Sequence, residues 1–462
     1  MASNFDPAGS PFLNGIFAPT QSELDDQPLA VIAGAVPADL DGTYYRNGPN
    51  ARFAPLGSYT YPLDGDGMLH AVHFRDGRAT YSNRYVRTPS MAAEERAGRA
   101  LWGGIMTPIM PSADQVGAEL AATYKDLPDV NVVRHAGRLL ALAESAPPFE
   151  MTDMFDTVGP CYFDGKLPKG ITAHPKIDPV TGELVVFRYD LVAPFLNWAI
   201  IGANGTVTRS EEPIEIDASY MIHDFVITAR VLVLFVCPAR FDLNAEQVLS
   251  WQPDRGTRIA IIARDGSAPP RWIATEAFWV WHFANGYEEV DTHGATTIVV
   301  DYPHWTSLPL GAAQPDTRGG ITRARLDPAA GTASFEALDD QATEFPRIDD
   351  RRMGQPNRYF HALSKDHALG KGLWNILRRF DRQTGAAATR SFGATSVGEA
   401  VFVPSARDGD ENQGYLLTYG FDGDVTRLFI LHASDIAGEP AAVLRLPQRV
   451  PAGLHGCWVP GQ

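Results

Sequence analysis

The fold is decided most clearly by one stretch near the N-terminus, LHAVHFRDGRATYSNRY, which covers residues 69–85. It predicts two β-strands, one ending at Phe74 and one beginning at Ala79, joined by a turn over residues 75–78. The turn contains Asp76-Gly77, and this pair tolerates the positive φ angles that tight hairpin turns require. The stretch therefore predicts an antiparallel hairpin.

Similar pairs of strands recur along the chain. Glycine, asparagine or aspartate stands between the strands of each pair, as tight turns require. The further predicted hairpins cover residues 131–143, 197–211 and 414–432, with turns at 135–137, 204–205 and 422–423. Residues 231–236, VLVLFV, form a continuous apolar run, which is typical of an inner strand buried on both faces.

A turn signature of the form Asp-x-x-x-Gly also repeats, at residues 178–182, 327–331 and 381–385. Many short strands, little helical signal and this irregular repeat favour an all-β chain, and a β-propeller over a sandwich. The innermost strands of separate blades face one axis in a propeller, so residues distant in sequence can meet there. We expect one domain over residues 1–462, with residues 1–26 as a peripheral N-terminal segment.

Composition excludes several classes of function. The 462 residues carry a net charge of −16, which argues against a nucleic-acid partner because phosphates attract basic surfaces. Hydrophobic residues make up 45%, yet no apolar run reaches the roughly 18 residues of a membrane-spanning helix. Three scattered cysteines do not suggest a disulfide framework, and the N-terminus lacks the pattern of a signal peptide. We expect a cytoplasmic protein with no obligate protein partner.

Histidines in apolar settings carry the strongest chemical signal, and the four of interest are His174, His223, His282 and His455. Imidazole nitrogens without carboxylates suit iron, copper or zinc better than magnesium or calcium. Each of these histidines could instead be an ordinary core residue, because sequence spacing alone does not make them converge. His70 and His73 stand three apart on a predicted strand, so they point to opposite faces and receive no metal role.

Helical signal is sparse and is strongest over residues 90–104, where Ser90 can cap a helix. The apolar segment over residues 101–110 is broken by glycine and proline. It can be plain core, line an apolar substrate entrance, or make transient contact with a membrane surface. The sequence leaves these three interpretations open.

Five motifs follow one another in the order found in a known family. They are YRNGP at 45–49, DGDGM at 64–68, AHPKIDP at 173–179, MIHDF at 221–225 and LHG at 454–456. With these motifs the chain resembles the carotenoid cleavage oxygenases, of a bacterial type, from about residue 27 to the C-terminus. The resemblance implies a seven-bladed β-propeller, with loops and a helix forming a dome over a non-haem ferrous iron. It also implies that this iron is bound by His174, His223, His282 and His455.

The resemblance further places three glutamates behind the ligands. The pairs it implies are Glu144 with His223, Glu344 with His282, and Glu399 with His455. A carboxylate that accepts one ring N–H fixes the tautomer of the histidine, so the other ring nitrogen can bind metal.

The implied reaction splits a conjugated C=C bond with O2 into two carbonyl compounds. Four imidazoles leave two of six positions on iron for O2 and water, and the alkene itself can supply the electrons. We therefore expect one Fe(2+) per chain, O2 as co-substrate, and no catalytic residue beyond the iron centre. The candidate substrate-binding residues are Val130, Ala143, Phe149, Trp281 and Phe283, with Phe195, Trp198, Trp279 and Trp458 as further tunnel walls.

Departures from the family pattern bear on the substrate. Members that cleave lignin-derived stilbenes grip a phenol with a lysine and a tyrosine. Here Ala143 stands in the lysine position and residues 101–111 contain no tyrosine, although Tyr124 and Lys125 lie nearby in sequence. Val130 stands where the family often has a threonine near the open iron position.

Three function classes remain open after these observations. The first is oxidative cleavage of an apocarotenoid or carotenoid. The second is the same reaction on an aryl alkene, such as a stilbene or an isoeugenol-like compound. The third is an isomerohydrolase of the family, or a propeller that binds a ligand without catalysis.

Overall fold

The computed structural model describes residues 6–59, 62–105, 107, 109–245, 248–308, 318–366, 374–406 and 409–461. The chain divides into two compact units. Unit 1 comprises Met1–Tyr162, Ala394–Ser405 and Gly414–Gln462, and unit 2 comprises Phe163–Gly393 and Ala406–Gln413. Strands dominate the described part of both units, and helices are few, as predicted for an all-β chain.

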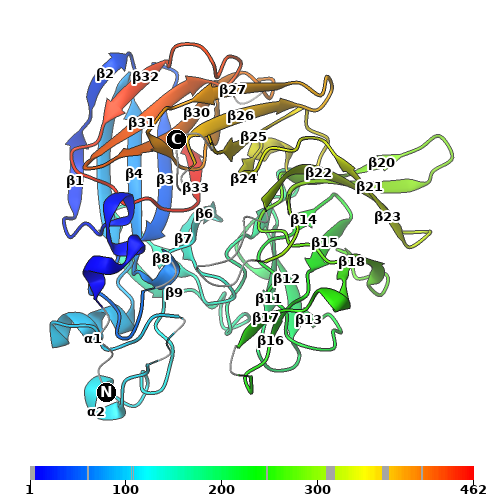
Figure 1. Cartoon of the computed structure of the whole chain (residues 1–462), viewed down its shortest axis with the longest axis horizontal. Helices are drawn as coiled ribbons and strands as arrows, with labels where there is room; N and C mark the ends of the chain where they lie inside the picture. Colours follow the sequence, from blue (N-terminus) through cyan, green and yellow to red (C-terminus); the bar gives the residue numbers. More distant parts are fainter. Residues whose placement is uncertain are drawn as a thin grey trace. The chain divides into compact units, whose positions relative to one another are not determined.

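Unit 1 contains three sheets (Figure 1). The first has the order β1-β5-β4-β3-β33, the second β6-β7-β8-β9, and the third β2-β32-β31-β30-β28, with β29 also paired to β30. Their bounds are β1 Leu24–Pro28, β2 Ala30–Gly34, β3 Gly42–Pro49, β4 Gly67–Arg75, β5 Arg78–Tyr85, β6 Asn131–His135, β7 Arg138–Leu142, β8 Phe149–Met151, β9 Thr157–Pro160, β28 Ser396–Val397, β29 Val401–Pro404, β30 Gly414–Asp422, β31 Val425–His432, β32 Ala442–Arg445 and β33 Gly456–Pro460. The last strand, red in Figure 1, thus pairs with β3 from the beginning of the chain, with Arg46 opposite Gly456.

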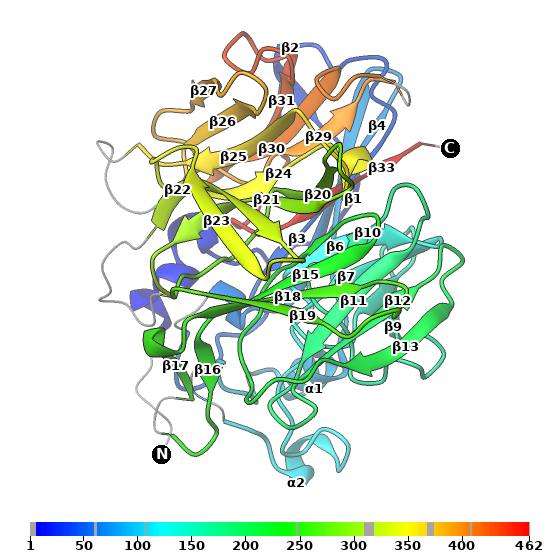
Figure 2. The same cartoon turned by 90° about the vertical axis from the view of Figure 1, so that its right-hand side faces the viewer.

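Unit 2 contains four four-stranded sheets, β10-β11-β12-β13, β14-β15-β18-β19, β20-β21-β22-β23 and β24-β25-β26-β27, with a small sheet of β16 and β17 (Figure 2). Their bounds are β10 Lys176–Ile177, β11 Leu184–Tyr189, β12 Leu196–Ile201, β13 Val207–Pro213, β14 Val226–Ile227, β15 Val231–Val236, β16 Ala239–Phe241, β17 Leu249–Trp251, β18 Thr257–Ala263, β19 Arg271–Thr275, β20 Asn285–Val290, β21 Thr296–Trp305, β22 Arg318–Asp327, β23 Thr332–Ala337, β24 Thr343–Arg347, β25 Tyr359–Ser364, β26 Ile376–Asp381 and β27 Ala387–Ser391. Among the described residues, the two units together hold seven sheets of four or more strands, the number of blades expected.

The predicted hairpins are confirmed. β4 and β5 pair across a turn in which Asp76 has φ 51° and Gly77 has φ 69°, the positive angles expected of this sequence. The other three hairpins are β6–β7, β12–β13 and β30–β31. The apolar run is β15, an inner strand between β14 and β18 that is almost wholly buried.

The three Asp-x-x-x-Gly signatures form equivalent turns in three sheets of unit 2. They connect β10 to β11, β22 to β23, and β26 to β27. In the first, the Asp178 carboxylate accepts the N–H of Val180 at 2.9 Å, and Gly182 has φ 72°. Such a turn needs an acceptor at its start and a residue that adopts positive φ at its end.

The prediction for the helix was partly wrong. The helix α1 spans Pro89–Ala97, and its N-cap is Thr88, whose hydroxyl accepts the N–H of Met91 at 3.1 Å. Ser90 lies inside the first turn instead, because Pro89 occupies the first helical position, where a missing N–H costs nothing. The helix ends before Gly98, which has φ 67°. Among the described residues, the remaining helices are α2 Ala113–Val116 and the 3-10 turns Pro7–Gly9, Pro11–Leu13, Gly15–Phe17, Pro62–Asp64, Pro253–Arg255 and Asp350–Arg352.

The apolar segment after α1 is divided between core and surface. Leu101 and Trp102 are buried and pack with Ala93 of α1. Ile105 and Ile109 are 48% and 37% exposed. No helix within the described ranges is long and apolar enough to cross a membrane. Contact of this segment with a membrane surface stays a prediction.

Candidate metal centre

Three of the predicted ligands lie in unit 2, each at the same point of a different sheet. His174 lies two residues before β10, and His223 lies three residues before β14. His282 lies three residues before β20. Each of these strands is the edge strand that opens its four-stranded sheet, so the three sheets present their histidines in equivalent positions.

The histidines of unit 2 lie against one another. The Nε2 atoms of His174 and His223 are 3.1 Å apart. The centroid of the His282 ring lies 5.1 Å from those of the other two. Two imidazole nitrogens that bind one first-row metal ion at right angles, each at about 2.1 Å, are about 3.0 Å apart. The spacing of His174 and His223 fits two neighbouring ligands of a single ion.

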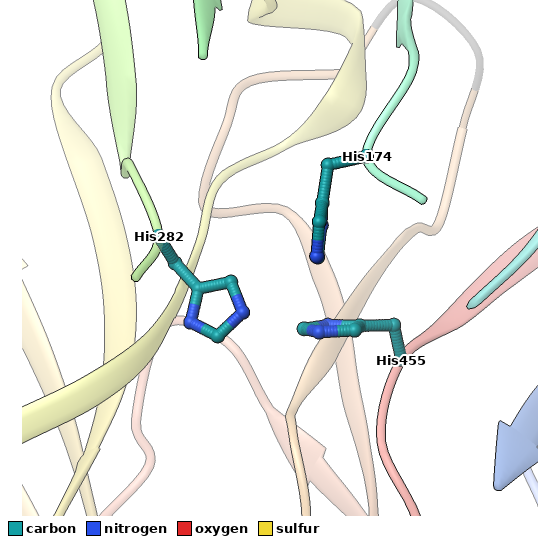
Figure 3. A group of neighbouring side chains, drawn as sticks. All are labelled: His174, His282 and His455. Atoms are coloured by element: carbon teal, nitrogen blue, oxygen red, sulfur yellow. The ribbon is translucent and has the colours of Figure 1, made fainter. Parts of the chain in front are cut away.

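A three-histidine group includes the ligand predicted near the C-terminus. The ligand nitrogens of His174, His282 and His455 all lie within 4.8 Å of one another, and such a group could hold a metal ion (Figure 3). His174 and His455 are buried, the side chain of His282 is 12% exposed, and the three rings point toward one another in Figure 3. The donor set is neutral nitrogen, which suits a transition metal.

Glu344, in β24, fixes the orientation of His282. Its Oε2 lies 2.6 Å from Nδ1 of His282, and its Oε1 accepts the indole N–H of Trp305 at 2.9 Å. Glu344 is buried, and a carboxylate there only accepts hydrogen bonds, so Nδ1 carries the proton. Nε2 of His282 is then the ring nitrogen whose lone pair can bind metal.

A strained residue supports this pair. Phe345 has φ 52°, a left-handed conformation that is unfavourable for a bulky side chain. Its N–H donates to Oε2 of Glu344 at 2.7 Å, and its ring stacks on His282 with centroids 5.3 Å apart. The strained backbone therefore holds both the carboxylate and the ring that the carboxylate orients.

Glu399 orients His455 within unit 1. Its Oε1 lies 2.9 Å from Nδ1 of His455, and its Oε2 accepts the N–H of Gly456 at 3.0 Å. The backbone of His455 is also held on both sides. Its N–H donates to the carbonyl of Val130 at 3.2 Å, and its carbonyl accepts the N–H of Asn47 at 2.9 Å.

The third predicted glutamate occupies a comparable local setting. Glu144 is half-buried just after β7, and Ser145 follows it with φ 50°. Glu344 is likewise followed by a residue of positive φ, Phe345. The pairing of Glu144 with His223 stays a prediction.

The predicted pocket residues have different surroundings. Trp281 is half-buried, with its ring 4.9 Å from that of His223, so it lies beside the histidine group. Phe283 and Phe149 are packed in hydrophobic cores instead. Val130 is buried and Ala143 is half-buried. Of the further candidates, Trp198 and Trp279 are core residues, while Trp458 and Phe195 are half-buried.

Sequence reasoning missed two residues beside the histidines of unit 2. Lys176 and Asp224 form an ion pair, with Nζ 2.6 Å from Oδ1. The other oxygen of Asp224 accepts the N–H of Phe283 at 3.0 Å. Both residues stand within quoted histidine motifs, and their opposite charges in apolar surroundings were the available signal.

Lys125, an alternative phenol partner, is already engaged. Its Nζ lies 2.7 Å from Oδ1 of Asp66 and 2.8 Å from Oε2 of Glu94. Burial lowers the pKa of Lys125, but the two carboxylates more than offset this effect and raise it. Tyr124 is 62% exposed.

Comparisons with known proteins identify the family. A family model described as Retinal pigment epithelial membrane protein matches residues 17–460. The carotenoid cleavage oxygenase of Mycobacterium tuberculosis is 33% identical over 98% of each chain. The chain belongs to the carotenoid cleavage oxygenase family.

Relatives within this family differ in their named substrates. The isoeugenol monooxygenase of Pseudomonas nitroreducens is 30% identical and aligns over 97% of this chain and 98% of its own. The structure of Pseudomonas brassicacearum lignostilbene dioxygenase matches with a TM-score of 0.88 and 28% identity, covering 98% of this chain and 99% of that one. The seven-bladed β-propeller predicted from the sequence is confirmed by the seven sheets and this structural match.

Proposed function

We propose that this chain binds one Fe(2+) through His174, His223, His282 and His455 and cleaves a conjugated alkene of the apocarotenoid type. Its relatives named above are oxygenases and a dioxygenase that cleave carbon–carbon double bonds, so the chain is an oxidoreductase of that reaction class. The ion, the full ligand set and the substrate are what this proposal adds. The following observations support each of these additions.

The observation that carries the proposal is that two of the predicted ligands each donate Nδ1–H to a buried glutamate. His282 does so to Glu344, and His455 does so to Glu399. Structural histidines need no such fixed tautomer, whereas metal-binding histidines commonly have a carboxylate or carbonyl behind them. The carboxylates also supply negative charge to a site whose ligands are neutral.

Geometry and local similarity support the proposal for the remaining two ligands. The 3.1 Å between the Nε2 atoms of His174 and His223 suits two ligands of one ion. Glu144 has the positive-φ neighbour that Glu344 has, which supports its pairing with His223. A bound ferrous ion would supply the capacity to activate O2 without a separate reductant. The protein contributes fixed ring orientations and exclusion of water.

The substrate preference rests on the two described positions expected to bind a phenol, Ala143 and Lys125. A phenol oxygen buried without a hydrogen-bond partner costs several kcal/mol, about 2–7 by transfer measurements. Ala143 cannot supply such a partner, and Lys125 is paired with two carboxylates. Trp281 offers an apolar surface next to His223. These features favour an apolar polyene.

A second candidate is the same reaction on an aryl alkene. It is favoured by the similarity to isoeugenol monooxygenase and to lignostilbene dioxygenase over nearly the whole chain. The two candidates share the histidines and glutamates, and differ only in the pocket.

The test is a panel of alkenes incubated aerobically with the Fe(2+)-loaded protein. The panel contains an apocarotenoid, 4-hydroxystilbene and 4-methoxystilbene, with O2 uptake recorded and products identified by mass spectrometry. We expect O2 uptake coupled to two carbonyl products, with the apocarotenoid cleaved at least as fast as the stilbenes.

Two other outcomes would change the conclusion. Cleavage of 4-hydroxystilbene alone would establish the second candidate and contradict the preference for polyenes. An isomerised or hydrolysed product without O2 uptake would contradict the oxygenase assignment for this chain.

A further inference from the structure

Asp224 connects the three histidine segments of unit 2. Its Oδ1 pairs with Nζ of Lys176 at 2.6 Å, and its Oδ2 accepts the N–H of Phe283 at 3.0 Å. Lys176 stands two residues after His174, Asp224 itself follows His223, and Phe283 follows His282. One carboxylate thus joins the ends of three segments that lie far apart in sequence.

This carboxylate is deeply buried. The side chains of Asp224 and Lys176 are only 3% and 11% exposed. Oδ1 also accepts the N–H of Phe225 at 2.8 Å, and the ammonium of Lys176 lies 5.7 Å from the Phe225 ring centroid. A charge buried to this degree needs a paired cation and full hydrogen bonding, and the arrangement supplies both.

The pair adds nothing that the sheets themselves require. β10, β14 and β20 each have their own antiparallel partner strand, so their backbone hydrogen bonds do not depend on Asp224. The pair acts between sheets, at the segments that precede these strands. Its geometric effect is to fix how the three histidine segments are spaced.

We propose that Lys176 and Asp224 are positioning residues that set the spacing of His174, His223 and His282 for one metal ion. This inference rests on the proposed metal-binding function. Neither residue belongs to the proposed ligand set. Their contribution is that the histidines are already in place before the metal arrives, so binding requires little reordering.

A matched control exists between the same two sheets. Nη1 of Arg264 lies 2.6 Å from Oδ2 of Asp178, with side chains 7% and 9% exposed. Like the Lys176–Asp224 pair, it joins the segment around β10 to the sheet of β14 and β18. The guanidinium of Arg264 also donates to the carbonyl of Thr228 and to the carboxylate of Glu183. Neither of these residues stands next to a predicted ligand histidine. Arg264→Met therefore removes a similar buried ion pair whose carboxylate, unlike Asp224, does not directly follow a predicted ligand.

The experiment titrates the metal-free protein with Co(II), using its absorption spectrum and a competing chelator. Asp224→Asn and Lys176→Met should weaken Co(II) binding about 10–100-fold, as expected for a lost outer partner of a metal site, and should alter the spectrum. Lys176→Arg keeps the charge and should bind close to wild type. Arg264→Met should lower the denaturation midpoint while leaving affinity and spectrum unchanged.

The outcomes separate this inference from the proposed function. Wild-type protein that binds no metal would contradict the proposed function. Wild-type protein that binds metal, with Asp224→Asn and Lys176→Met binding equally well and with the same spectrum, would overturn only the positioning role. Equal loss of affinity in Arg264→Met would also overturn it, because a general weakening of the fold would then explain the effect.

Discussion

Two buried carboxylates, Asp224 in unit 2 and Glu94 in unit 1, have the same kinds of partner but anchor different segments of the chain. Each pairs with a buried lysine, Asp224 with Lys176 and Glu94 with Lys125. Each also accepts backbone N–H groups, which ties a neighbouring segment to the ion pair.

The difference lies in what those segments carry. Asp224 holds Phe283, next to His282, whereas Glu94 accepts the N–H groups of Leu101 and Trp102, at the start of the apolar segment after α1. The charges differ as well. Asp224 balances one lysine, while Lys125 faces both Glu94 and Asp66. A buried lysine therefore indicates a chemical role only when its partners lie beside the reactive groups.

The largest effect is expected from removing the lysine of unit 1. Lys125→Met leaves two buried carboxylates without their cation, and breaking a buried ion pair in this way costs about 3–5 kcal/mol. We expect the free energy of unfolding in urea to fall by this amount, with Co(II) affinity unchanged. A loss of metal affinity equal to that of Lys176→Met would show that the two regions are not functionally distinct.

A smaller effect is expected where a carboxylate holds a histidine directly. Glu399→Gln and Glu344→Gln keep the shape of the side chain but replace one carboxylate oxygen with an NH2 group. That NH2 group must then face an N–H donor to which the carboxylate was hydrogen-bonded. We expect about a 10–100-fold loss of metal affinity or activity in each. Glu336→Gln, at an exposed position of β23, is the matched control. If Glu399→Gln had the metal affinity and activity of wild type, the hydrogen bond between Glu399 and His455 would no longer support the metal site.

The surplus negative charge of the Lys125 region predicts a pH effect. Burial, and then the charges of Asp64 and Asp66, raise the pKa of Asp129 well above its ordinary value. The native state therefore holds this proton more tightly than the unfolded state. The resulting stability is fully present below the unfolded pKa of about 3.9 and is lost as pH rises through the native pKa.

Asp129→Asn cannot ionise, so it should escape this loss. We expect its unfolding free energy to exceed that of wild type at pH 8, because only the wild-type carboxyl loses stability as it ionises. This difference in unfolding free energy between the variant and wild type should narrow as pH is lowered toward 4. A constant gap across this range would mean that Asp129 is ionised in the native state.

The smallest effect concerns the substrate. Lys125 is committed to two carboxylates, so a 4-hydroxyl group on a stilbene should gain nothing from it. We expect 4-hydroxystilbene and 4-methoxystilbene to be cleaved at comparable rates. A strict requirement for the free hydroxyl, abolished by Lys125→Met, would show that this lysine changes partners when substrate binds.

Local sequence patterns predicted the four hairpins, and only the family resemblance predicted the histidine–glutamate pairs of His282 and His455. Hairpins such as β4–β5 are local, so the Asp76-Gly77 pair reveals them. The pairs Glu344–His282 and Glu399–His455 came from resemblance to a family, since no local pattern links residues so far apart. Lys176 and Asp224 were missed for the same reason: their contact joins two different sheets, and neither residue is unusual alone. Thr88 was missed as the cap because Ser90 offered the same chemistry two residues later.

The central claim, that the four histidines hold a redox-active iron, is tested most directly by metal content after reconstitution with Fe(2+). Wild type should retain about one iron per chain, and His223→Ala and His455→Ala should lose both iron and alkene cleavage while keeping β-sheet circular dichroism. His73→Ala, which removes a half-buried histidine bonded to Thr43, should retain both. Full iron and full activity in His223→Ala would contradict the account. So would full activity of iron-free, zinc-loaded protein, because zinc cannot exchange electrons with O2.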